Sequence, residues 1–414
     1  MRLFFKISTC PEVNENTQHK LKQFKNDRGL DLSIRVVAGV SKDRKIRIDA
    51  IGNHLQSGCY DFVFLQEVWV EEDFQLIANK VANVMPHSHY FHSGVIGGGI
   101  CILSKAKIID VFFHAWSLNG YIHKIQHGDW FGGKGVGLCT VIYHGLKINL
   151  YVTHLHAEYN PSSDEYHAHR VVQAFETSQM IRYTRNKADV CILGGDLNTE
   201  PGSLAYRLIS DHTSLQDLYL ATGKPDSEGT TSETSVNSYT AIESLYACPN
   251  GKRIDFIMGS SREGLQIETV NVNIPLPSRI PGYPFSYSDH EAVCAKFRIV
   301  EGQSNVSSQS KELSICSLKE ALQVCDSALR NLSNDRRNYW LAFGLFIVLL
   351  MTLPFSYDGS RIVHYTLMVT HLFLTLVAVF CLIMATLWNR IELHGILAGK
   401  LAIITRLKFL ENLI

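Results

Sequence analysis

Two long apolar runs near the C-terminus restrict the possible folds of this chain more than any other feature. They cover residues 339–355 and 364–388, and between Tyr339 and Trp388 only Asp358 and Arg361 are charged. A membrane-spanning helix needs roughly 17–25 apolar residues, and the short link between the runs allows only a tight turn. The pattern predicts a transmembrane helical hairpin. The alternative is a hairpin buried in the core of a soluble protein.

The flanks of the two runs predict their orientation. The basic residues that precede the first run and follow the second are Arg336, Arg337, Arg390, Lys400, Arg406 and Lys408. Because positively charged flanks stay on the cytosolic side, both ends are expected there. We therefore expect an integral protein of the endoplasmic reticulum or another internal membrane, with a cytosolic N-terminal domain. Residues 389–414 are expected to form a cytosolic amphipathic tail, either on the membrane surface or as a helix packed on the domain or a partner.

Composition excludes several classes of protein. The 414 residues carry 39 basic and 39 acidic side chains, and 46% are hydrophobic. A disordered chain would be poorer in apolar residues, and 10 cysteines over this length are too few for a disulfide-rich scaffold. Residues 32–300 hold 23 basic against 27 acidic side chains. A surface that binds nucleic acid should be basic, so we expect no nucleic-acid partner.

Residues 32–300 alternate between strand and helix patterns. Short apolar runs predict strands at Phe62–Leu65, Ile100–Leu103, Val136–Tyr143, Ile148–Thr153, Val190–Leu193, Ile254–Met258 and Ala292–Ile299. Helical periodicity is found at Lys45–Leu55, Glu72–Val84, Tyr166–Arg185 and Leu204–Ile209. This is one large α/β domain with mixed strand pairing. Residues 1–31 are expected to be irregular, and residues 301–338 a Ser-rich linker followed by a juxtamembrane helix.

Residues with catalytic potential lie at the ends of the expected strands, where open sheets place their sites. They are Glu67, His154, Asp196, Asn198, Asp255, Asp289 and His290. Each alone is usually a solvated group. Together they supply hard oxygen ligands, two histidines and an amide, with no cysteine nearby to favour zinc. Such a set suits Mg²⁺ acting on a phosphate group.

The ordered motifs LQEVW, THLHAEYN, GGDLN, RIDFI and SDHEA resemble those of the endonuclease/exonuclease/phosphatase superfamily, which has the deoxyribonuclease I-like fold. Within it, HGDWFGGKGVG, YVTHLHAEYN and the C-terminal hairpin are similar to the neutral sphingomyelinases of the sphingomyelin phosphodiesterase 2 type. The resemblance covers about residues 41–300. It implies an α/β fold, a four-layer sandwich built on two packed sheets.

The resemblance implies roles for the groups that activate water. Glu67 corresponds to the magnesium-ligating glutamate of the family. His290 corresponds to the general base that takes a proton from the attacking water. Asp255 would orient this histidine, and Asp289 would either help to bind the metal or orient His290.

The resemblance also implies which groups bind the substrate. Asp196 and Asn198 would position water and phosphate, with Asp196 also contacting the substrate, and His154 would donate to a phosphoryl oxygen. The segment from Gly128 to Lys134 formally matches G-x-x-x-x-G-K, but Gly135 stands where a P-loop has Ser or Thr, and a strand follows. Nucleotide binding is therefore excluded, and Lys134 and Asp129 are expected to contact the lipid phosphate or headgroup.

One departure from the family concerns the first strand. The family carries L-N-C-W-G-[IL]-P before a K-x-x-R helix, and the Asn of this motif belongs to the metal site. Here residues 34–37 run directly into residues 38–42. Either a segment was lost from this version of the chain or another group takes the place of the asparagine.

These patterns predict a Mg²⁺-dependent phospholipase C-type hydrolase. It would split a membrane lipid, sphingomyelin or ceramide phosphoethanolamine, into ceramide and a phosphorylated headgroup. Two alternatives stay open. One is another phosphodiesterase or phosphatase of the same fold, such as a lysophospholipid phospholipase C or a nuclease. The other is a lipid-binding protein whose catalysis is impaired because the first-strand motif is missing. The oligomeric state is not indicated.

Overall fold

The computed structural model describes residues 2–7, 30–33, 42–125, 127–160, 162–302, 309–354 and 359–412. Side chains are described within these ranges from Lys42 onward, apart from residues 309–310. The chain divides into two compact units, Met1–Ser317 and Leu318–Ile414. Each is considered by itself below.

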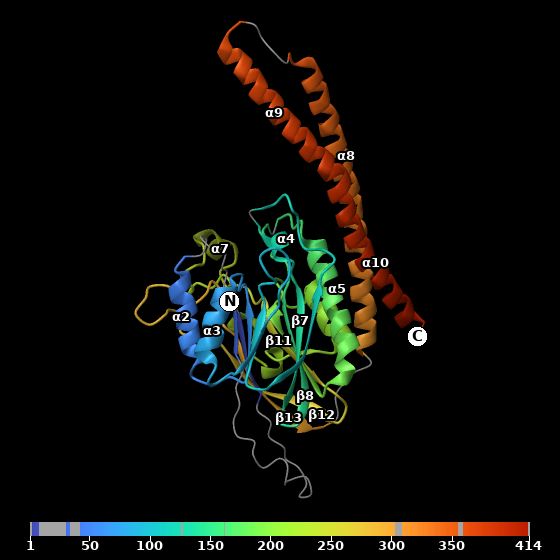
Figure 1. The fold of residues 1–414 in the computed structure, drawn as a ribbon. Helices are drawn as coiled ribbons and strands as arrows, with labels where there is room; N and C mark the ends of the chain where they lie inside the picture. Colours follow the sequence, from blue (N-terminus) through green and yellow to red (C-terminus); the bar gives the residue numbers. More distant parts are fainter. Residues whose placement is uncertain are drawn as a thin grey trace, which may run out of the picture. The chain divides into compact units, whose positions relative to one another are not determined.

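The described part of the first unit is built on two β-sheets (Figure 1). The first sheet has the order β12-β13-β1-β2-β3-β5-β4. Its strands are β1 (Arg2–Ile7), β2 (Leu30–Ser33), β3 (Phe62–Gln66), β4 (His87–Tyr90), β5 (Cys101–Ser104), β12 (Leu265–Asn273) and β13 (Cys294–Glu301). The second sheet has the order β10-β11-β9-β8-β7-β6. Its strands are β6 (Ile108–Ala115), β7 (Gly135–Tyr143), β8 (Leu146–His154), β9 (Val190–Asp196), β10 (Gln216–Asp217) and β11 (Asp255–Ser261). Both sheets mix parallel and antiparallel pairs, as predicted.

Helices cover the outer faces of the two sheets. They are α2 (Arg44–Leu55) and α3 (Glu71–Val81) on the first sheet, and α5 (His167–Thr184) and α6 (Leu204–Thr213) on the second. The short helices α4 (Asp129–Gly132) and α7 (Ile242–Ala247) lie in loops, and single 3₁₀ turns occur at Arg185–Lys187, Leu220–Thr222 and Asp226–Glu228. The order helix, sheet, sheet, helix confirms the predicted four-layer α/β sandwich.

Strand β3 illustrates how the sequence builds these layers. Phe62 and Phe64 are buried between the two sheets, whereas Val63 and Leu65 are buried under α2 and α3. Successive side chains of a strand point to opposite faces. A strand covered on both sides therefore needs an unbroken apolar run, which is what residues 62–65 supply.

The structure corrects the predicted boundaries of this domain. Residues Arg2–Ile7 form β1, which pairs with β13 and β2 inside the first sheet, and β2 begins at Leu30. The expectation that residues 1–31 are irregular is therefore wrong for these two segments. The short RLFFKI run is too isolated in a polar stretch to be recognised as a strand, because its partners lie far along the chain. The first unit also extends past residue 300, to Ser317.

The second unit consists of long helices. Helix α8 (Gln309–Thr352), whose residues up to Ser317 belong to the first unit, is followed by α9 (Arg361–Ile383), a π-helical turn (Met384–Trp388) and α10 (Asn389–Glu411). Helix α8 runs antiparallel to the later helices, because the residue numbers of the contacts rise along α8 while they fall along its partners. These contacts are Lys319 with Glu411, Asp326 with Lys400, Leu332 with Asn389, and Tyr339 with Phe380.

This arrangement changes the expected linker and tail. The Ser-rich segment is helical from Gln309 onward, so residues 301–338 contain a shorter linker than expected. Residues Asn389–Glu411 are helical and pack against α8, a contact that neither of the two alternatives for the tail included. In the described part of the chain, one helical segment, Arg361–Glu411, is long and apolar enough to cross a membrane. Of the first predicted span, residues 339–352 form the end of α8, and the crossing of a membrane by this span stays a prediction.

The core between the sheets should carry much of the stability of the first unit. Leu150 on β8 is fully buried in this core. Leu150→Ala should lower the free energy of unfolding by about 2–5 kcal/mol, because it removes apolar contacts and leaves a cavity. Urea unfolding followed by near-ultraviolet circular dichroism measures this. Ile142→Ala, at a half-exposed position of the neighbouring strand, is the matched control and should change the value little.

Candidate active site

The register of three neighbouring strands places three predicted site residues in a row. Asp196 at the end of β9 pairs with His154 on β8 and with Asp255 on β11. Residues paired across neighbouring strands point to the same face of a sheet. The Nε2 atom of His154 accordingly lies 3.3 Å from the Oδ2 atom of Asp196. The three residues are buried at one end of the second sheet.

His290 and Asp255 form a dyad beside this row. The Nδ1 atom of His290 lies 3.1 Å from the Oδ2 atom of Asp255, a carboxylate that is inaccessible to solvent. The hydroxyl of Thr231 donates to the same oxygen. The other ring nitrogen, Nε2, lies 3.0 Å from the hydroxyl oxygen of Ser232, and both residues line a pocket. The carboxylate thus fixes the imidazole ring with its second nitrogen toward the pocket.

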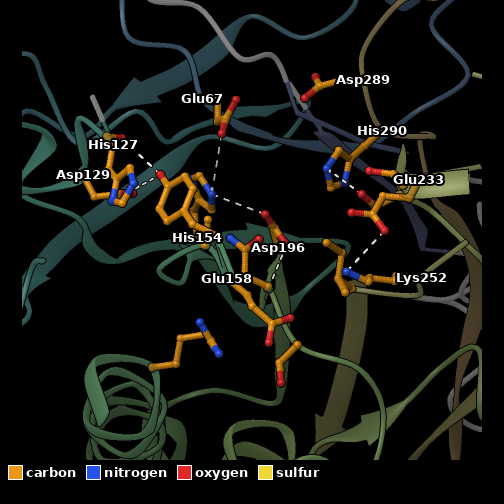
Figure 2. A pocket seen from close by; sticks show the side chains of 18 of the residues that line it. Glu67, His127, Asp129, His154, Glu158, Asp196, Glu233, Lys252, Asp289 and His290 are labelled. Atoms are coloured by element: carbon orange, nitrogen blue, oxygen red, sulfur yellow. Dashed lines mark hydrogen bonds and ion pairs between the residues drawn. The ribbon is translucent and has the colours of Figure 1, made fainter. Parts of the chain in front are cut away.

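Glu67 enters the same pocket from the end of β3. Its Oε1 atom lies 3.8 Å from the Nε2 atom of His154. A dashed line marks this pair in Figure 2. Its backbone has φ of +57°, a left-handed conformation that is costly for a residue with a side chain. Asn198 (+45°) and Glu233 (+55°) share this conformation and line the same pocket. Three of the six non-glycine residues with positive φ in the described part of the chain thus line the pocket, and such backbone strain is often found at functional sites.

Asn198 connects two of the strand ends. Its backbone N–H donates to the Oδ1 atom of Asp196 at 2.8 Å, and its side-chain amide donates to the carbonyl oxygen of Leu155 at 2.8 Å. These bonds hold the loop after β9 against the end of β8. Asn198 therefore positions Asp196 and borders the pocket at the same time.

The buried ion pair of Lys134 and Asp129 lines another side of the pocket. The Nζ atom of Lys134 lies 2.5 Å from the Oδ1 atom of Asp129 and 3.3 Å from the Nε2 atom of His154. Burial alone would raise the pKa of Asp129, but Lys134 and His156 outweigh it and hold this pKa well below its usual range. Burial lowers the pKa of His154, and Lys134 lowers it further. The pocket thus contains a lysine ammonium beside a histidine that favours its neutral form.

The structure brings all the predicted site residues to one place. The pocket is lined by Glu67, Asp129, Lys134, His154, Asp196, Asn198, Asp289 and His290, and Asp255 lies behind it in contact with His290. Figure 2 shows most of these side chains around the pocket. They come from distant segments of the chain, and the sheet register brings them together.

Other residues of the site were not found from the sequence. Arg47 on α2 is buried, its Nε atom donates to the carbonyl oxygen of Tyr287 at 3.0 Å, and its Nη2 atom lies 3.6 Å from the Oδ1 atom of Asp289. It holds the segment that precedes His290. A signal was present: Arg47 precedes Ile51 and Leu55 at spacings of four residues, on the buried face of the helix. For Thr231 and Ser232, which lie in a polar loop, no pattern was available.

A histidine cluster lies behind the ion pair. His156 stacks on Tyr166 at 3.8 Å between ring centroids, and its Nε2 atom lies 3.4 Å from the Oδ2 atom of Asp129. Burial lowers the pKa of His156 to about 4 and that of the neighbouring His169 to about 3. Tyr159, which lines the pocket, donates to Asp129 at 2.6 Å. The cluster fixes the carboxylate that pairs with Lys134.

The donor set fits one magnesium ion bound together with a substrate. Among the described residues, no group of three or more His, Cys, Asp or Glu side chains is placed to hold a metal. Mg²⁺ commonly uses one or two carboxylates and takes its other ligands from water and substrate phosphate. The Glu67 carboxylate, turned into the pocket by its positive φ, meets this need. Residues 34–41, where the family motif would end, lie outside the described residues.

Comparison with known sequences agrees with this geometry. The profile of the Endonuclease/Exonuclease/phosphatase family matches residues 37–290, which include every predicted site residue. The chain belongs to this endonuclease/exonuclease/phosphatase family. Within the family it resembles neutral sphingomyelinases, as the motifs indicated, and these relatives are phosphodiesterases.

Three relatives illustrate the range of the similarity. A neutral sphingomyelinase homologue from Drosophila melanogaster is 39% identical over an alignment of 427 positions. This alignment covers 90% of this chain and 94% of the relative's chain. Sphingomyelin phosphodiesterase 2 from Homo sapiens is 38% identical over 320 residues, 75% of this chain and 73% of its own. Inositol phosphosphingolipids phospholipase C from Schizosaccharomyces pombe is 32% identical over 274 residues, 61% of this chain and 64% of its own.

The buried histidines should make the first unit sensitive to acid. An unfolded histidine takes up its proton near pH 6.5, whereas His156 and His169 do so only at about 4 and about 3. Each therefore contributes stability above pH 6.5 that is lost as the pH falls toward these values, by up to about 1.4 kcal/mol per pH unit.

Urea unfolding of the full chain in detergent between pH 7 and pH 5 measures this loss. His169→Asn should flatten the dependence on pH, because one of the two late protonations is removed. An unchanged slope in this variant would contradict the assignment.

Proposed function

We propose that this chain is a Mg²⁺-dependent phospholipase C-type hydrolase that cleaves sphingomyelin into ceramide and phosphocholine. The observation that carries the proposal is the His290–Asp255 dyad, which faces a pocket lined by Glu67, Lys134 and His154. The similarity to sphingomyelin phosphodiesterase 2 over 75% of this chain supports the choice of substrate. Ceramide phosphoethanolamine is a close relative of this substrate and is the next candidate.

The dyad provides the base for attack by water. The Nε2 atom of His290 faces the pocket and can accept a proton from a water molecule, while Asp255 stabilises the imidazolium that forms. The water oxygen then forms a bond to phosphorus, and the bond between phosphorus and the ceramide oxygen breaks. The departing ceramide oxygen takes up a proton from solvent water, and the imidazolium returns its proton to water. The hydrogen bond from the Thr231 hydroxyl holds the Asp255 carboxylate in place during this step.

The opposite wall compensates the charge of the phosphate. Lys134 and His154 lie 3.3 Å apart and can donate to phosphoryl oxygens as negative charge develops there. Asn198, next to Asp196, positions the substrate at the strand ends. Mg²⁺ held by Glu67 would add further charge neutralisation at the phosphoryl oxygens.

The long helices would keep the enzyme at its substrate. Large apolar side chains on the C-terminal part of α8 and on α9 are exposed, among them Leu341, Leu345, Val348, Ile362, Val369, Leu372, Phe373 and Leu376. Such surfaces are stable in lipid rather than in water. With basic flanks on the cytosolic side, the first unit would act on the cytosolic leaflet of the endoplasmic reticulum or another internal membrane. Anchoring raises the effective concentration of a membrane substrate.

Charge helps to choose among headgroups. Eight acidic side chains but only three lysines and arginines are described in the pocket lining. Each of the three bases is ion-paired with an acid: Lys134 with Asp129, Arg170 with Asp164, and Lys252 with Glu233. This lining favours a cationic headgroup such as choline, and it disfavours a polyanion such as nucleic acid. Inositol phosphosphingolipid is a third candidate, supported by the relative from Schizosaccharomyces pombe.

Removing the base should abolish most of the hydrolysis. His290→Ala should lower kcat by about 10²–10⁴-fold, because this is the usual contribution of a positioned general base, and Asp255→Asn should lower it in the same direction. The assay is release of phosphocholine from sphingomyelin vesicles in the presence of Mg²⁺. His89→Gln, on β4 and outside the pocket lining, is the control. Unchanged turnover in His290→Ala would exclude His290 as the base. No release by the wild type would refute the proposal and favour a lipid-binding protein without catalysis.

The metal ligand can be tested separately from the base. Glu67→Gln should raise the Mg²⁺ concentration needed for half-maximal activity by about tenfold or more, because it removes an anionic ligand. A chelator should abolish the activity of the wild type. Glu200→Gln, another acid of the pocket lining, should leave the Mg²⁺ requirement unchanged. Equal Mg²⁺ requirements in Glu67→Gln and the wild type would exclude Glu67 as a ligand.

A further inference from the structure

Exposed apolar side chains border one side of the pocket. Val95 and Ile125 are 76% and 71% exposed, although both are large aliphatic residues. The backbone N–H groups of Val95 and Ile96 donate to the carbonyl oxygen of Phe131, at 2.7 and 3.2 Å, which holds this loop against α4. Ile96 lines the pocket itself. These residues form a first apolar lip.

A second apolar lip lies on α7. Ala241 and Ser244 line the pocket, whereas Ile242 and Tyr246, which are four residues apart and share another face of the helix, are 66% and 83% exposed. Figure 1 shows α4 and α7 at the same end of the two sheets. Exposed apolar groups thus lie next to pocket-lining residues in two separate segments, one beside α4 and one on α7.

The position of the two lips indicates what covers them. Scattered exposed apolar residues are ordinary, but a group that borders a pocket marks an interaction surface. If the pocket receives the headgroup of a membrane lipid, the surface that carries this headgroup must come up to the pocket mouth. Apolar lips would then enter the region of the lipid headgroups and upper acyl chains.

The charged side chains around the pocket indicate whether an anionic or a zwitterionic membrane fits this surface. The bases of the pocket are ion-paired, and Lys124 beside Ile125 pairs with Glu165. In contrast, Glu158 and Glu200 at the pocket have no ion-pair partner among the described residues. Such a surface gains little from an anionic membrane, and it suits a zwitterionic one whose outermost groups are cholines.

We propose that Val95, Ile96, Ile125, Ile242 and Tyr246 form an interfacial surface that enters a zwitterionic bilayer and brings the lipid headgroup to the pocket. This proposal rests on the proposed function, because it takes a membrane lipid to be the substrate. It goes further in assigning contact with the bilayer to the catalytic unit, in addition to the apolar helices.

The test compares two substrates that share the phosphocholine group. The triple variant Ile125→Ser, Ile242→Ser, Tyr246→Ser is reconstituted as the full chain in phosphatidylcholine vesicles that contain long-chain sphingomyelin. Its hydrolysis of sphingomyelin should fall about tenfold, because apolar area no longer enters the interface. Its hydrolysis of a water-soluble aryl phosphocholine diester should stay at the wild-type level, because this substrate reaches the pocket without a membrane.

A matched control replaces three exposed residues away from the pocket. Ile109→Ser, Ile142→Ser, Tyr183→Ser removes side chains that are 50%, 50% and 73% exposed, and it should act on both substrates like the wild type. Equal losses in the two triple variants, or an equal loss on both substrates, would overturn the proposal. A change from dimer to monomer in the first variant would assign the surface to a second copy of the chain instead. Strong activation by phosphatidylserine would contradict the choice of a zwitterionic membrane.

A second measurement does not depend on activity. Tyr246→Trp should add fluorescence that brominated phosphatidylcholine quenches in the same vesicles, whereas Tyr183→Trp should add fluorescence that it does not quench. Absence of quenching at position 246 would overturn the proposal. If the wild type hydrolyses no sphingomyelin but residue 246 is quenched, the proposed function fails while contact with the bilayer stands.

Discussion

The register of β9 between β8 and β11 is the constraint on which the site depends. It places His154, Asp196 and Asp255 side by side, and Asp255 in turn orients His290. A shift of one residue would turn each of these side chains to the opposite face of the sheet. The apolar core between the two sheets, which includes Leu150, Ile192 and Ile257, holds the register. The same register of β8, β9 and β11 therefore determines both the packing of the core and the placement of the catalytic groups at the strand ends.

Charges around the site are buried in pairs, and this arrangement has an energetic cost. Lys134 and Asp129 are almost inaccessible, and their desolvation is offset only because each has several partners. Arg47 is held in the same way by Tyr287 and Asp289. Such pairs contribute little net stability, but they leave few alternative positions for the groups that they hold. The buried polar contacts therefore fix the positions of the side chains around the pocket, in addition to the apolar core between the sheets.

The sequence predicted most of the central strands and missed all four edge strands, for a physical reason. Strands β3, β5 and β9 are buried along their whole length, so their apolar runs are continuous. The missed edge strands, β4, β6, β10 and β12, stand at the ends of the two sheets, and their polar and exposed residues break the pattern. Two interior strands, β1 and β2, were missed as well, because each is a short run at the polar N-terminal end of the sequence. Site residues were found where a motif ended a strand. Arg47, Thr231 and Ser232 escaped because their roles depend on contacts with distant segments.

The long helices have one more consequence. Buried residues on α9, the π-helical turn and α10 recur at steps of three and four, as in a coiled coil: Leu374, Ala378, Cys381, Ala385, Trp388, Glu392, Ile396, Gly399, Ile403, Leu407 and Leu410. One seam thus runs through the apolar half and the polar half of this helical segment. In lipid, apolar contact alone drives helix association weakly. The ion pairs of the polar half, Lys400 with Asp326 and Lys319 with Glu411, would therefore help to keep the apolar half in the same alignment.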